Sequence, residues 1–355
     1  MAAAQAPPDP KTGLALFGLP AGTSRAEAVT EGYINDTFKV WIGGKPAYIL
    51  QRINTEVFGD PAGLMGNLET VLPRLQAADY TALELMRTPK GDSWATDPAG
   101  NAWRMYRYIP GSRTLESASD PRIAREAGRI LGRFHQLAEA VPAASLHPTL
   151  PRFHDLGWRL EQLHEAEEGA LADRRAPASS WTALAHELAA RCEDIPWEQM
   201  PLRVCHNDTK LSNTLFDAES GRALCLIDLD TLMPGYLVYD VGDAVRTLLN
   251  PLPEDHPDWE SIRIDPELFR AFVQGLQQSG LALHPAERTA LAYGAVLMPL
   301  LHGIRALADY LLGDRYYKTA YPEQNRVRAC NLLYFAKLAS DHLGHLREIC
   351  LEELG

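Results

Sequence analysis

Two polar segments of the chain carry residue types that are suited to chemistry. The first reads VCHNDTKLSNTL over residues 204–215, with Asp208 followed five positions later by Asn213. The second reads LIDLD and contains Asp228, fifteen residues beyond Asn213. Phosphoryl transfer to a hydroxyl requires a carboxylate near the acceptor oxygen and oxygen ligands that hold Mg²⁺ against the phosphates. Asp208 can supply that base, and Asn213 and Asp228 can supply those ligands.

The spacing of Asp208 and Asn213 has little weight alone, because Asp and Asn are common in loops, where they hydrogen-bond the local backbone. The conjunction is more specific: an HxDxxxxN motif, an apolar run and a second Asp, in this order and after a β-rich segment. Within the motif, His206 is expected to be buried and to orient the loop. For Lys210 the alternatives are a γ-phosphate contact and an exposed loop side chain. For Asp230 they are metal binding and pairing with an arginine.

The segments before these loops are β-rich. Residues 29–53 predict a β-hairpin around Gly43-Gly44, and residues 102–109 predict a further strand that ends at Pro110-Gly111. Between them, Asp60-Pro61 predicts the start of a helix, since Asp caps and Pro suits the first turn. We expect residues 1–110 to form a nucleotide-binding lobe, of which about the first dozen residues are Ala/Pro-rich and frayed.

The remainder, residues 111–355, is expected to form a mostly helical lobe with the catalytic loop, the metal loop and the acceptor site. Asp120-Pro121 predicts a helix with an apolar stripe. Residues 155–200 are also helical in pattern, with a predicted break at residues 175–177. Short strands are expected before each polar loop, and helices from residue 265 onward. The fold class is therefore α/β (α+β) with two lobes.

Composition limits the partners and the compartment. The chain has 355 residues, with 34 basic and 46 acidic side chains and a formal charge of −12. This charge repels phosphate backbones, so no nucleic-acid partner is expected. Five scattered cysteines without metal-ligand spacing indicate reduced thiols. No apolar run approaches the roughly 20 residues that span a bilayer, so we expect no membrane association and a cytoplasmic location.

The two polar segments also carry a family resemblance. HNDTKLSNTLF and LCLIDLD resemble the catalytic and metal loops of the aminoglycoside phosphotransferase and choline kinase superfamily, which are relatives of protein kinases. EGYINDT, ILQRIN, LMPG, YDVGDAVR and RALADYLLGD further resemble N-acetylhexosamine 1-kinases, over about residues 30–335. The resemblance implies a protein-kinase-like fold that uses ATP and Mg²⁺. Asp208 would take the proton of the anomeric hydroxyl of GlcNAc or GalNAc, and Asn213 and Asp228 would hold the Mg²⁺.

The N-terminal segment departs from the kinase pattern, because it has neither a GxGxxG loop nor the usual strand lysine. Backbone amides near Gly32, together with Asn35 and Thr37, would have to cradle the phosphates instead. Arg52 is the favoured cation for pairing with phosphate, since its guanidinium is planar and permanently charged. Glu69 is the best candidate for a carboxylate partner on the helix, with a solvated helix face as the equal alternative.

The resemblance also implies further contacts with the nucleotide and the sugar. Tyr106 and Tyr108 lie in the segment expected to form the hinge beside adenine, although packing between the lobes is the commoner role for such rings. Lys210 is kept as a nucleotide contact. Arg305 and Tyr317 are expected to bind the sugar, the alternative for Arg305 being a structural salt bridge. Residues 239–243 are expected to support the catalytic loop.

Two other functions stay open at this point. One is a kinase of another small alcohol, such as an aminoglycoside, choline, homoserine or a different hexose. The other is a nucleotide-binding pseudokinase that acts as a scaffold. Only the missing glycine-rich loop and strand lysine favour the scaffold, while Asp208, Asn213 and Asp228 oppose it, because a scaffold has no chemical need for all three.

Overall fold

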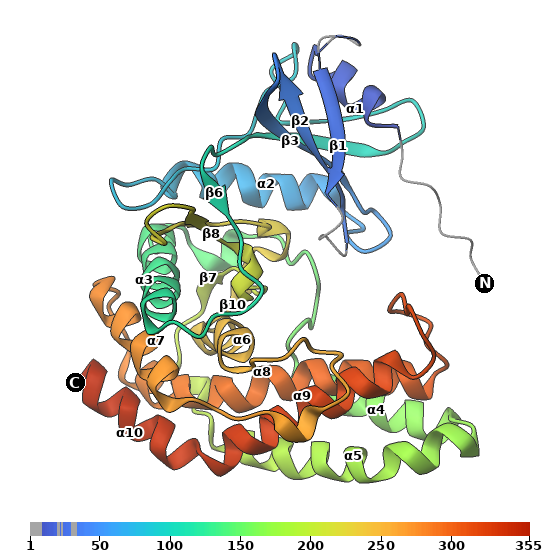
Figure 1. Cartoon of the computed structure of the whole chain (residues 1–355), viewed down its shortest axis with the longest axis vertical. Coiled ribbons are helices and arrows are strands. Elements are labelled where there is room, and N and C mark those ends of the chain that lie inside the picture. The colour runs from blue at the N-terminus through green and yellow to red at the C-terminus, as the bar shows by residue number, and fades with distance from the viewer. Residues whose placement is uncertain (1–8, 20–21, 23, 30–33) are drawn as a thin grey trace.

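The computed structural model describes residues 9–19, 22, 24–29 and 34–355. Gly32, predicted to lie at the nucleotide phosphates, is outside the described residues. The described chain forms a sheet lobe, at the top of Figure 1, and a larger helical lobe below it. The predicted two-lobe α+β architecture is confirmed. The chain enters the helical lobe at β6 (Ser112–Arg113), which pairs with a strand of that lobe.

The sheet of the first lobe has five antiparallel strands in the order β1-β2-β3-β5-β4. The predicted hairpin joins β2 and β3 through Gly43 and Gly44, whose φ values of 58° and 78° are left-handed. Two consecutive positive φ values favour glycine at both positions of this turn. The strands are β1 Ser24–Val29, β2 Asp36–Ile42, β3 Lys45–Ile53, β4 Trp94–Thr96 and β5 Ala102–Arg107.

The two faces of this sheet have different roles. Side chains alternate between the faces along a strand. One face packs against helix α1 (Pro10–Leu16) through a small apolar core that includes Phe38, Leu50 and Trp103. Residues on the opposite face, such as Ile53 and Ala102, join the larger core that continues into the helical lobe. The second face is therefore the one that borders the space between the lobes.

Helix α2 (Pro61–Val71) lies between the sheet lobe and the helical lobe (Figure 1). Asp60 caps it as predicted, accepting a hydrogen bond from Gly63 N at 3.0 Å. Asn67 is buried and donates to the carbonyls of His147 and Leu232, at 2.7 and 2.8 Å. These two bonds fix α2 to the helical lobe, because their acceptors belong to that lobe.

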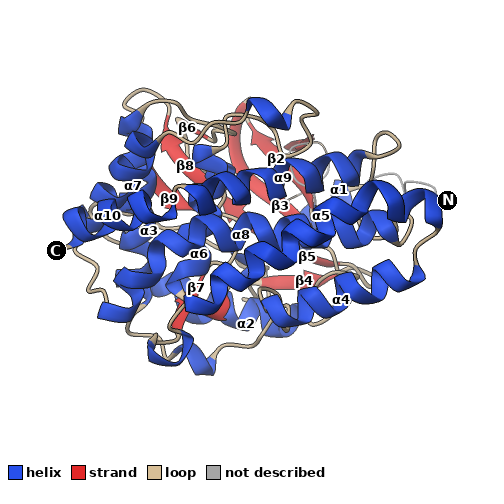
Figure 2. Ribbon diagram, turned by 90° about the horizontal axis from the view of Figure 1, so that it is seen from below, coloured by secondary structure: helices blue, strands red, loops and turns tan. Residues whose placement is uncertain are grey.

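The helical lobe contains two small antiparallel sheets beneath the first lobe. β8 (Thr214–Asp217) pairs with β6 and with β9 (Ala223–Leu226), and β7 (Arg203–Cys205) pairs with β10 (Met233–Gly235). The helical lobe has eight described α-helices, most of which pack around α8, as seen from below in Figure 2. They are α3 Pro121–Ala138, α4 Leu156–Gly169, α5 Ala172–Arg191, α6 Leu237–Leu249, α7 Pro266–Gln278, α8 Pro285–Leu311, α9 Gln324–Asp341 and α10 Leu343–Leu354.

The helix break predicted at residues 175–177 is wrong. α5 runs through Pro177, and the break lies at Ala170, whose backbone is extended (ψ 144°). Pro177 lacks one backbone donor, but it lies in the second turn of the helix, so the ring removes only the bond toward residue 173. A proline near the start of a helix is tolerated far better than one at its centre.

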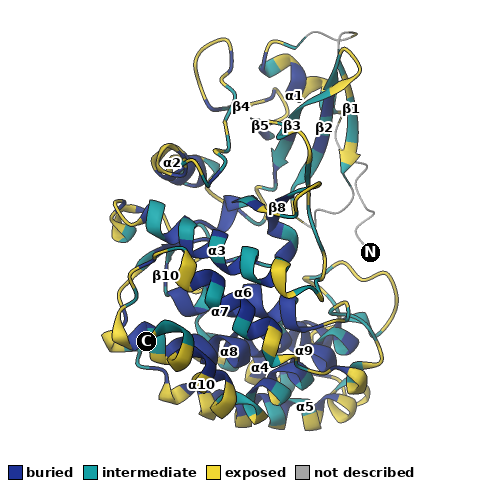
Figure 3. Cartoon of the chain, turned by 60° about the vertical axis from the view of Figure 1, so that its left-hand side comes forward, coloured by how far each residue is buried: buried dark blue, intermediate teal, exposed yellow. Residues whose placement is uncertain are grey.

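Helix α8 forms the centre of the helical lobe. Among the described residues it is the one helix that is long and apolar enough to cross a bilayer, but 89% of its apolar window is buried inside the protein. Figure 3 shows this buried interior above α5 and α10, whose outer faces are exposed. The burial explains its composition, since a helix surrounded by others is apolar on all sides.

Candidate active site

The catalytic loop leaves β7 and is held by the first turn of α6. The buried Asp240 carboxylate accepts hydrogen bonds from the backbone N–H groups of His206 and Asn207, at 2.8 and 2.7 Å. Asn207 has a left-handed φ of 63°, which the two bonds stabilise. His206 is buried as predicted: its Nδ1 accepts from Asp208 N at 3.2 Å, and its Nε2 therefore donates to the Ile227 carbonyl at 2.8 Å. His206 thus joins the catalytic loop to the loop that contains Asp228.

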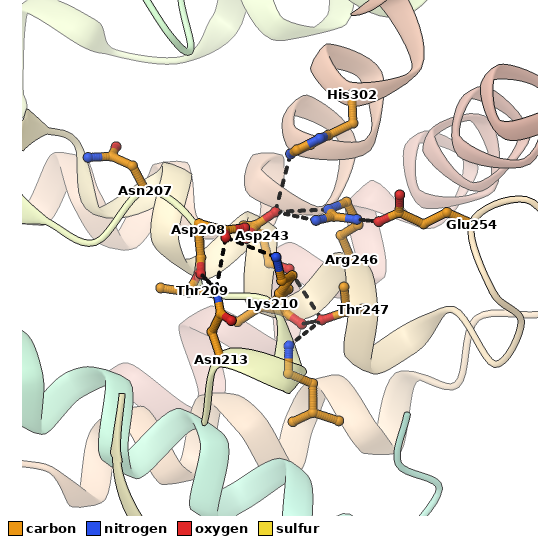
Figure 4. A network of polar contacts seen from close by, with 12 residues as sticks. Asn207, Asp208, Thr209, Lys210, Asn213, Asp243, Arg246, Thr247, Glu254 and His302 are labelled. Carbon is orange, nitrogen blue, oxygen red and sulfur yellow. Dashed lines mark hydrogen bonds and ion pairs between the residues drawn. The ribbon is translucent and has the colours of Figure 1, made fainter. Parts of the chain in front are cut away.

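The two carboxylate oxygens of Asp208 have different surroundings (Figure 4). Oδ2 accepts from Lys210 Nζ at 3.0 Å and from Asn213 Nδ2 at 2.8 Å. Oδ1 accepts no hydrogen bond from any residue that the structure describes, and the side chain is 20% exposed. Lys210 and Asn213 therefore fix the carboxylate and leave one oxygen open to an acceptor hydroxyl.

Asn213 and Asp228 are brought together by the backbone. Ile227 N donates to the Asn213 carbonyl at 2.8 Å, which places Asp228 beside the end of the catalytic loop. Asp228 has left-handed φ and ψ of 60° and 54°, an uncommon conformation for a residue other than glycine. The Asn213 amide nitrogen donates twice to Asp208, so its amide oxygen is the atom left for a cation.

The charges at this site fit a divalent cation. Burial and the neighbouring Asp230 raise the pKa of Asp228 to about 6, against the opposing effect of Lys210. Burial alone would lower the pKa of Lys210, but the charges of Asp208 and Asp228 outweigh it and raise that pKa above its usual range. The negative charge of Asp208, Asp228 and Asp230 is thus greater than the single positive charge of Lys210. Carboxylate and amide oxygens are ligands that suit Mg²⁺. Asn213 and Asp228 are the residues that would hold it.

Asp230 binds an arginine, one of its two predicted alternatives. Arg104 Nη1 lies 2.5 Å from Asp230 Oδ1, and both side chains are almost fully buried. Asn35 donates to Asp230 Oδ2 at 2.6 Å and accepts from Asn54 N at 2.9 Å. Two residues of the sheet lobe therefore reach the metal loop. Sequence reasoning missed Arg104, because the strand order that brings it there is not visible in the sequence.

The strand register corrects the expectation for Arg52. Thr37, Gln51 and Arg104 form one row across β2, β3 and β5, and their side chains lie on the face toward the helical lobe. Gln51 links the row by donating to Thr37 Oγ1 at 3.1 Å and accepting from Arg104 Nε at 3.0 Å. Arg52 lies on the opposite face, with Asp36 at 2.5 Å. This geometry places Arg52 away from the space between the lobes.

The remaining predicted nucleotide residues lie near the lobe junction. The Tyr106 ring lies 5.3 Å from Arg104 Cζ, and the Tyr108 ring lies 4.6 Å from Lys39 Nζ. Both rings therefore pack against cations of their own lobe. Glu69 pairs with Arg87 at 3.0 Å, and both side chains are about half exposed. The solvated helix face is thus the role that the structure gives Glu69.

The predicted sugar residues gather at one end of α8. Arg305 Cζ lies 5.0 Å from the Phe153 ring and 5.9 Å from the Tyr317 ring. Within the described residues it makes no ion pair, so the predicted alternative of a salt bridge is not observed. Burial and the charge of Arg305 lower the pKa of Arg159 to about 10, and Arg159 Nη2 donates to the Phe153 carbonyl at 3.0 Å. Arg328 lies 5.2 Å from the Tyr317 ring. Sequence reasoning missed Phe153, Arg159 and Arg328, which come from separate segments.

A buried ionic network lies beside the catalytic loop (Figure 4). Asp243 lies 2.7 Å from Arg246 and 3.3 Å from His302 of α8, and Arg246 also pairs with Glu254. Burial alone would raise the pKa of Asp243, but Arg246 and His302 hold it well below its usual range. His154 lies 3.1 Å from the Asn207 carbonyl. Asp243 therefore joins α6 to α8, and Asp240 of the same helix holds the catalytic loop, as expected for residues 239–243.

Comparison with known proteins agrees with this geometry. Residues 25–288 match the phosphotransferase enzyme family. The chain belongs to this family. Several solved structures share the fold of this phosphotransferase, at identities of 20% or less.

A microcompartment-associated aminopropanol kinase is 20% identical, with a TM-score of 0.66 over 95% of this chain and 97% of the other. An aminoglycoside phosphotransferase from Alicyclobacillus acidocaldarius is 16% identical, with a TM-score of 0.68 over 98% of each chain. A spectinomycin phosphotransferase in complex with ADP and spectinomycin is 14% identical, with a TM-score of 0.62 over 92% of this chain and 96% of the other.

Proposed function

We propose that this phosphotransferase transfers the γ-phosphoryl group of ATP to the anomeric 1-hydroxyl of an N-acetylhexosamine, GlcNAc or GalNAc. The observation that carries the proposal is the open Oδ1 of Asp208, in a loop linked to a region of arginines and aromatic rings. The resemblance of residues 232–246 and 305–314 to N-acetylhexosamine 1-kinases supports this choice of acceptor.

In this reaction Asp208 accepts the proton of the attacking hydroxyl at Oδ1, while Lys210 and Asn213 keep the carboxylate oriented through Oδ2. An anomeric hydroxyl is more acidic than an ordinary alcohol, so a carboxylate removes its proton more readily. Bound Mg²⁺, held by Asn213 and Asp228, would supply charge neutralisation at the ATP phosphates. Because the transition state is loose, positioning and electrostatics provide most of the rate.

The charge of the acceptor region favours a polyhydroxy acceptor over an amine. Arg305 lies near the rings of Phe153 and Tyr317, Arg328 lies near the Tyr317 ring, and Arg159 donates to the Phe153 carbonyl. Two further carboxylates are already bound, since Asp243 pairs with Arg246 and Glu254 pairs with both Arg246 and Arg328. Guanidinium groups donate to sugar hydroxyls and repel an ammonium group, and an aromatic ring suits the apolar face of a sugar.

An acceptor panel tests this proposal with ADP formation as the readout. GlcNAc and GalNAc should be phosphorylated in the presence of ATP and Mg²⁺. Glucose, galactose, homoserine, 1-amino-2-propanol, ethanolamine, choline and spectinomycin should give much lower kcat/KM. The Asp208→Asn variant controls for contaminating ATP hydrolysis. Turnover confined to the amines would contradict the sugar assignment and favour the kinase of another small alcohol.

A further inference from the structure

We infer that Arg104 is the cation with which the sheet lobe binds a nucleotide phosphate, in place of the strand lysine that the sequence lacks. The inference rests on the proposed kinase function, because it assigns a residue to its nucleotide site. Three observations carry it: the position of Arg104 in the sheet, the hydrogen bonds that its guanidinium leaves unmade, and its contact with the metal loop.

The position follows from the register. Arg104 on β5 lies directly beside Gln51 on β3, and Gln51 in turn lies beside Thr37 on β2. All three side chains are on the face toward the helical lobe, and Gln51 accepts a hydrogen bond from Arg104 Nε at 3.0 Å. Gln51 therefore orients the guanidinium, and the positive charge comes from the next strand of the sheet.

The guanidinium is buried but only partly hydrogen-bonded. The side chain of Arg104 is 1% exposed. Nη2 has no hydrogen-bond partner among the described residues, and Nη1 makes a close charge contact with Asp230 without the alignment of a hydrogen bond. Arginine has five N–H donors, and leaving buried donors unsatisfied is costly. Phosphate oxygens accept from guanidinium groups in the bidentate manner that these free donors allow.

The contact with Asp230 brings the guanidinium to the metal loop. Burial alone would lower the pKa of Arg104, but Asp230, Tyr106 and Asp228 outweigh it and raise that pKa. Asp228 is one of the two residues that would hold Mg²⁺. Asp230 is two residues from Asp228, so Arg104 lies beside the loop that would hold the metal, whereas Arg52 is bound to Asp36 and Asn101 on the other face of the sheet.

The test compares binding of ADP and of adenosine to the full chain by calorimetry with Mg²⁺. Arg104→Met removes the charge and keeps the length of the side chain. We expect it to weaken ADP binding by about ten- to a hundred-fold and to leave adenosine binding unchanged, since adenosine has no phosphate. Arg104→Lys should recover part of the lost ADP affinity, and Arg52→Met should bind ADP as the wild type does. Loss of ADP affinity in Arg52→Met, with Arg104→Met unaffected, would overturn the inference.

A second pair of variants separates phosphate binding from a merely structural role. Asp230→Asn and Arg104→Met/Asp230→Asn are compared with ADP in the absence of Mg²⁺, so that metal binding does not contribute. Arg104→Met alone leaves the buried Asp230 carboxylate without its partner, which can unfold the protein. The double variant removes both charges, so it can be measured even if Arg104→Met unfolds. We expect the double variant to bind ADP about ten-fold or more weakly than Asp230→Asn. Equal affinities would mean that Arg104 only neutralises Asp230, and would overturn the inference.

The same titrations distinguish this inference from the proposed function. Failure of the wild-type chain to bind ADP with Mg²⁺ would contradict the kinase function itself, and the role of Arg104 with it. Wild-type binding that Arg104→Met leaves unchanged would overturn the role of Arg104 alone. None of these measurements uses an acceptor, so they are independent of the identity of the sugar.

Discussion

Asp208 shows how a single carboxylate can be both fixed and available. Lys210 and Asn213 bind one of its oxygens, while the other accepts no hydrogen bond from the described residues. The backbone N–H of Asp208 is also tied to His206. A base held in this way loses little conformational freedom when the acceptor hydroxyl arrives, which is the advantage of a positioned catalytic group.

Asp208→Asn should remove most of the turnover, because an amide cannot accept the proton of the hydroxyl. General-base assistance is worth about 10²–10⁴ in rate. We expect kcat to fall by at least about 10²-fold with ADP affinity and thermal unfolding close to wild type. Steady-state kinetics and calorimetry on the same preparation provide these values. A variant with wild-type kcat would exclude Asp208 as the base.

Arg305→Ala should weaken sugar binding selectively. Arg305 makes no ion pair among the described residues, and its guanidinium lies within 6 Å of the rings of Phe153 and Tyr317. Losing one charged hydrogen bond should raise the KM for GlcNAc by about ten- to a hundred-fold, with the KM for ATP nearly unchanged.

Arg122 is the matched control for this substitution, since its side chain is 86% exposed and, among the described residues, pairs only with Asp120. Arg122→Ala should leave both KM values unchanged. If Arg305→Ala raised the KM for ATP and left that for GlcNAc as in wild type, Arg305 would belong to the nucleotide side of the site.

At the scale of elements, close helix contacts hold the helical lobe together. α3 and α7 cross where Gly128 of one and Gly275 of the other allow their backbones to touch. A Cβ at Gly275 would lie 1.9 Å from the Arg125 carbonyl oxygen, and one at Gly128 would lie 2.0 Å from the Phe272 carbonyl oxygen. Neither backbone can move without separating the two helices.

Gly275→Ala should therefore destabilise the protein, even though alanine favours helices. Overpacking of this kind typically costs about 1–3 kcal/mol. Gly66 of α2 is the control, since a Cβ there meets no atom of the described part of the chain within 4 Å. Gly66→Ala should be stabilising by about 0.5–1 kcal/mol. Urea unfolding of both variants measures these differences, and a Gly275→Ala variant as stable as Gly66→Ala would show that the helices can separate freely.

The sequence predicted those elements whose signals are local. The helix starts at Asp60-Pro61 and Asp120-Pro121 are correct, because capping involves neighbouring residues only. The same holds for the Gly43-Gly44 hairpin, while the roles assigned to the residues of the contiguous 206–213 motif stay predictions. The break predicted at Pro177 was wrong, since the effect of a proline depends on its position relative to a helix start that the sequence leaves uncertain.

The parts of the site that depend on tertiary pairing were not predictable in this way. Arg104 is held beside Gln51 and reaches Asp230 because β3 and β5 are neighbouring strands. Gln51 and Arg104 are 53 positions apart in the sequence, so this pairing is not visible locally. The acceptor region likewise collects Phe153, Arg159 and Arg328 from separate segments. Alternation along β3 could have shown that Gln51 and Arg52 face opposite ways, but not which face meets the helical lobe.

At the scale of the whole molecule, the two lobes divide the chemistry between them. In the proposed reaction the helical lobe supplies Asp208, Asn213 and Asp228, and the sheet lobe reaches the neighbouring Asp230 through Arg104 and Asn35. The protein carries a formal charge of −12, which repels ATP at long range. Local cations and the metal must therefore provide the attraction for the nucleotide, and its binding should depend strongly on both.

The stability of the molecule should fall in mild acid because of a buried histidine. His154 is 6% exposed, and burial together with His302 lowers its pKa from 6.5 to about 3. Below pH 6.5 the unfolded chain binds a proton at this position that the folded chain does not bind. The contribution of neutral His154 to the free energy of unfolding is therefore fully present above pH 6.5. It is lost progressively as the pH falls toward 3, by about 1 kcal/mol between pH 7.5 and 5.5.

Urea unfolding at pH 7.5 and pH 5.5 tests this contribution when the wild type is compared with His154→Gln. Glutamine does not titrate. The free energy of unfolding of His154→Gln should therefore fall by about 1 kcal/mol less than that of the wild type over the same pH interval. The neighbouring His302 and Asp243 remain in both proteins, and their contributions cancel in the comparison. Equal losses in the two proteins would show that His154 is protonated in the folded state.

The product of the reaction tests the central claim most directly. GlcNAc is incubated with ATP, Mg²⁺ and the full chain, and the product is analysed by phosphorus NMR and by an assay for reducing sugar. An anomeric kinase gives the sugar 1-phosphate, so the phosphorus should couple to the proton at C1 and the free reducing end should disappear as ATP is consumed. A 6-phosphate, or a reducing end that survives complete consumption of ATP, would contradict the anomeric assignment.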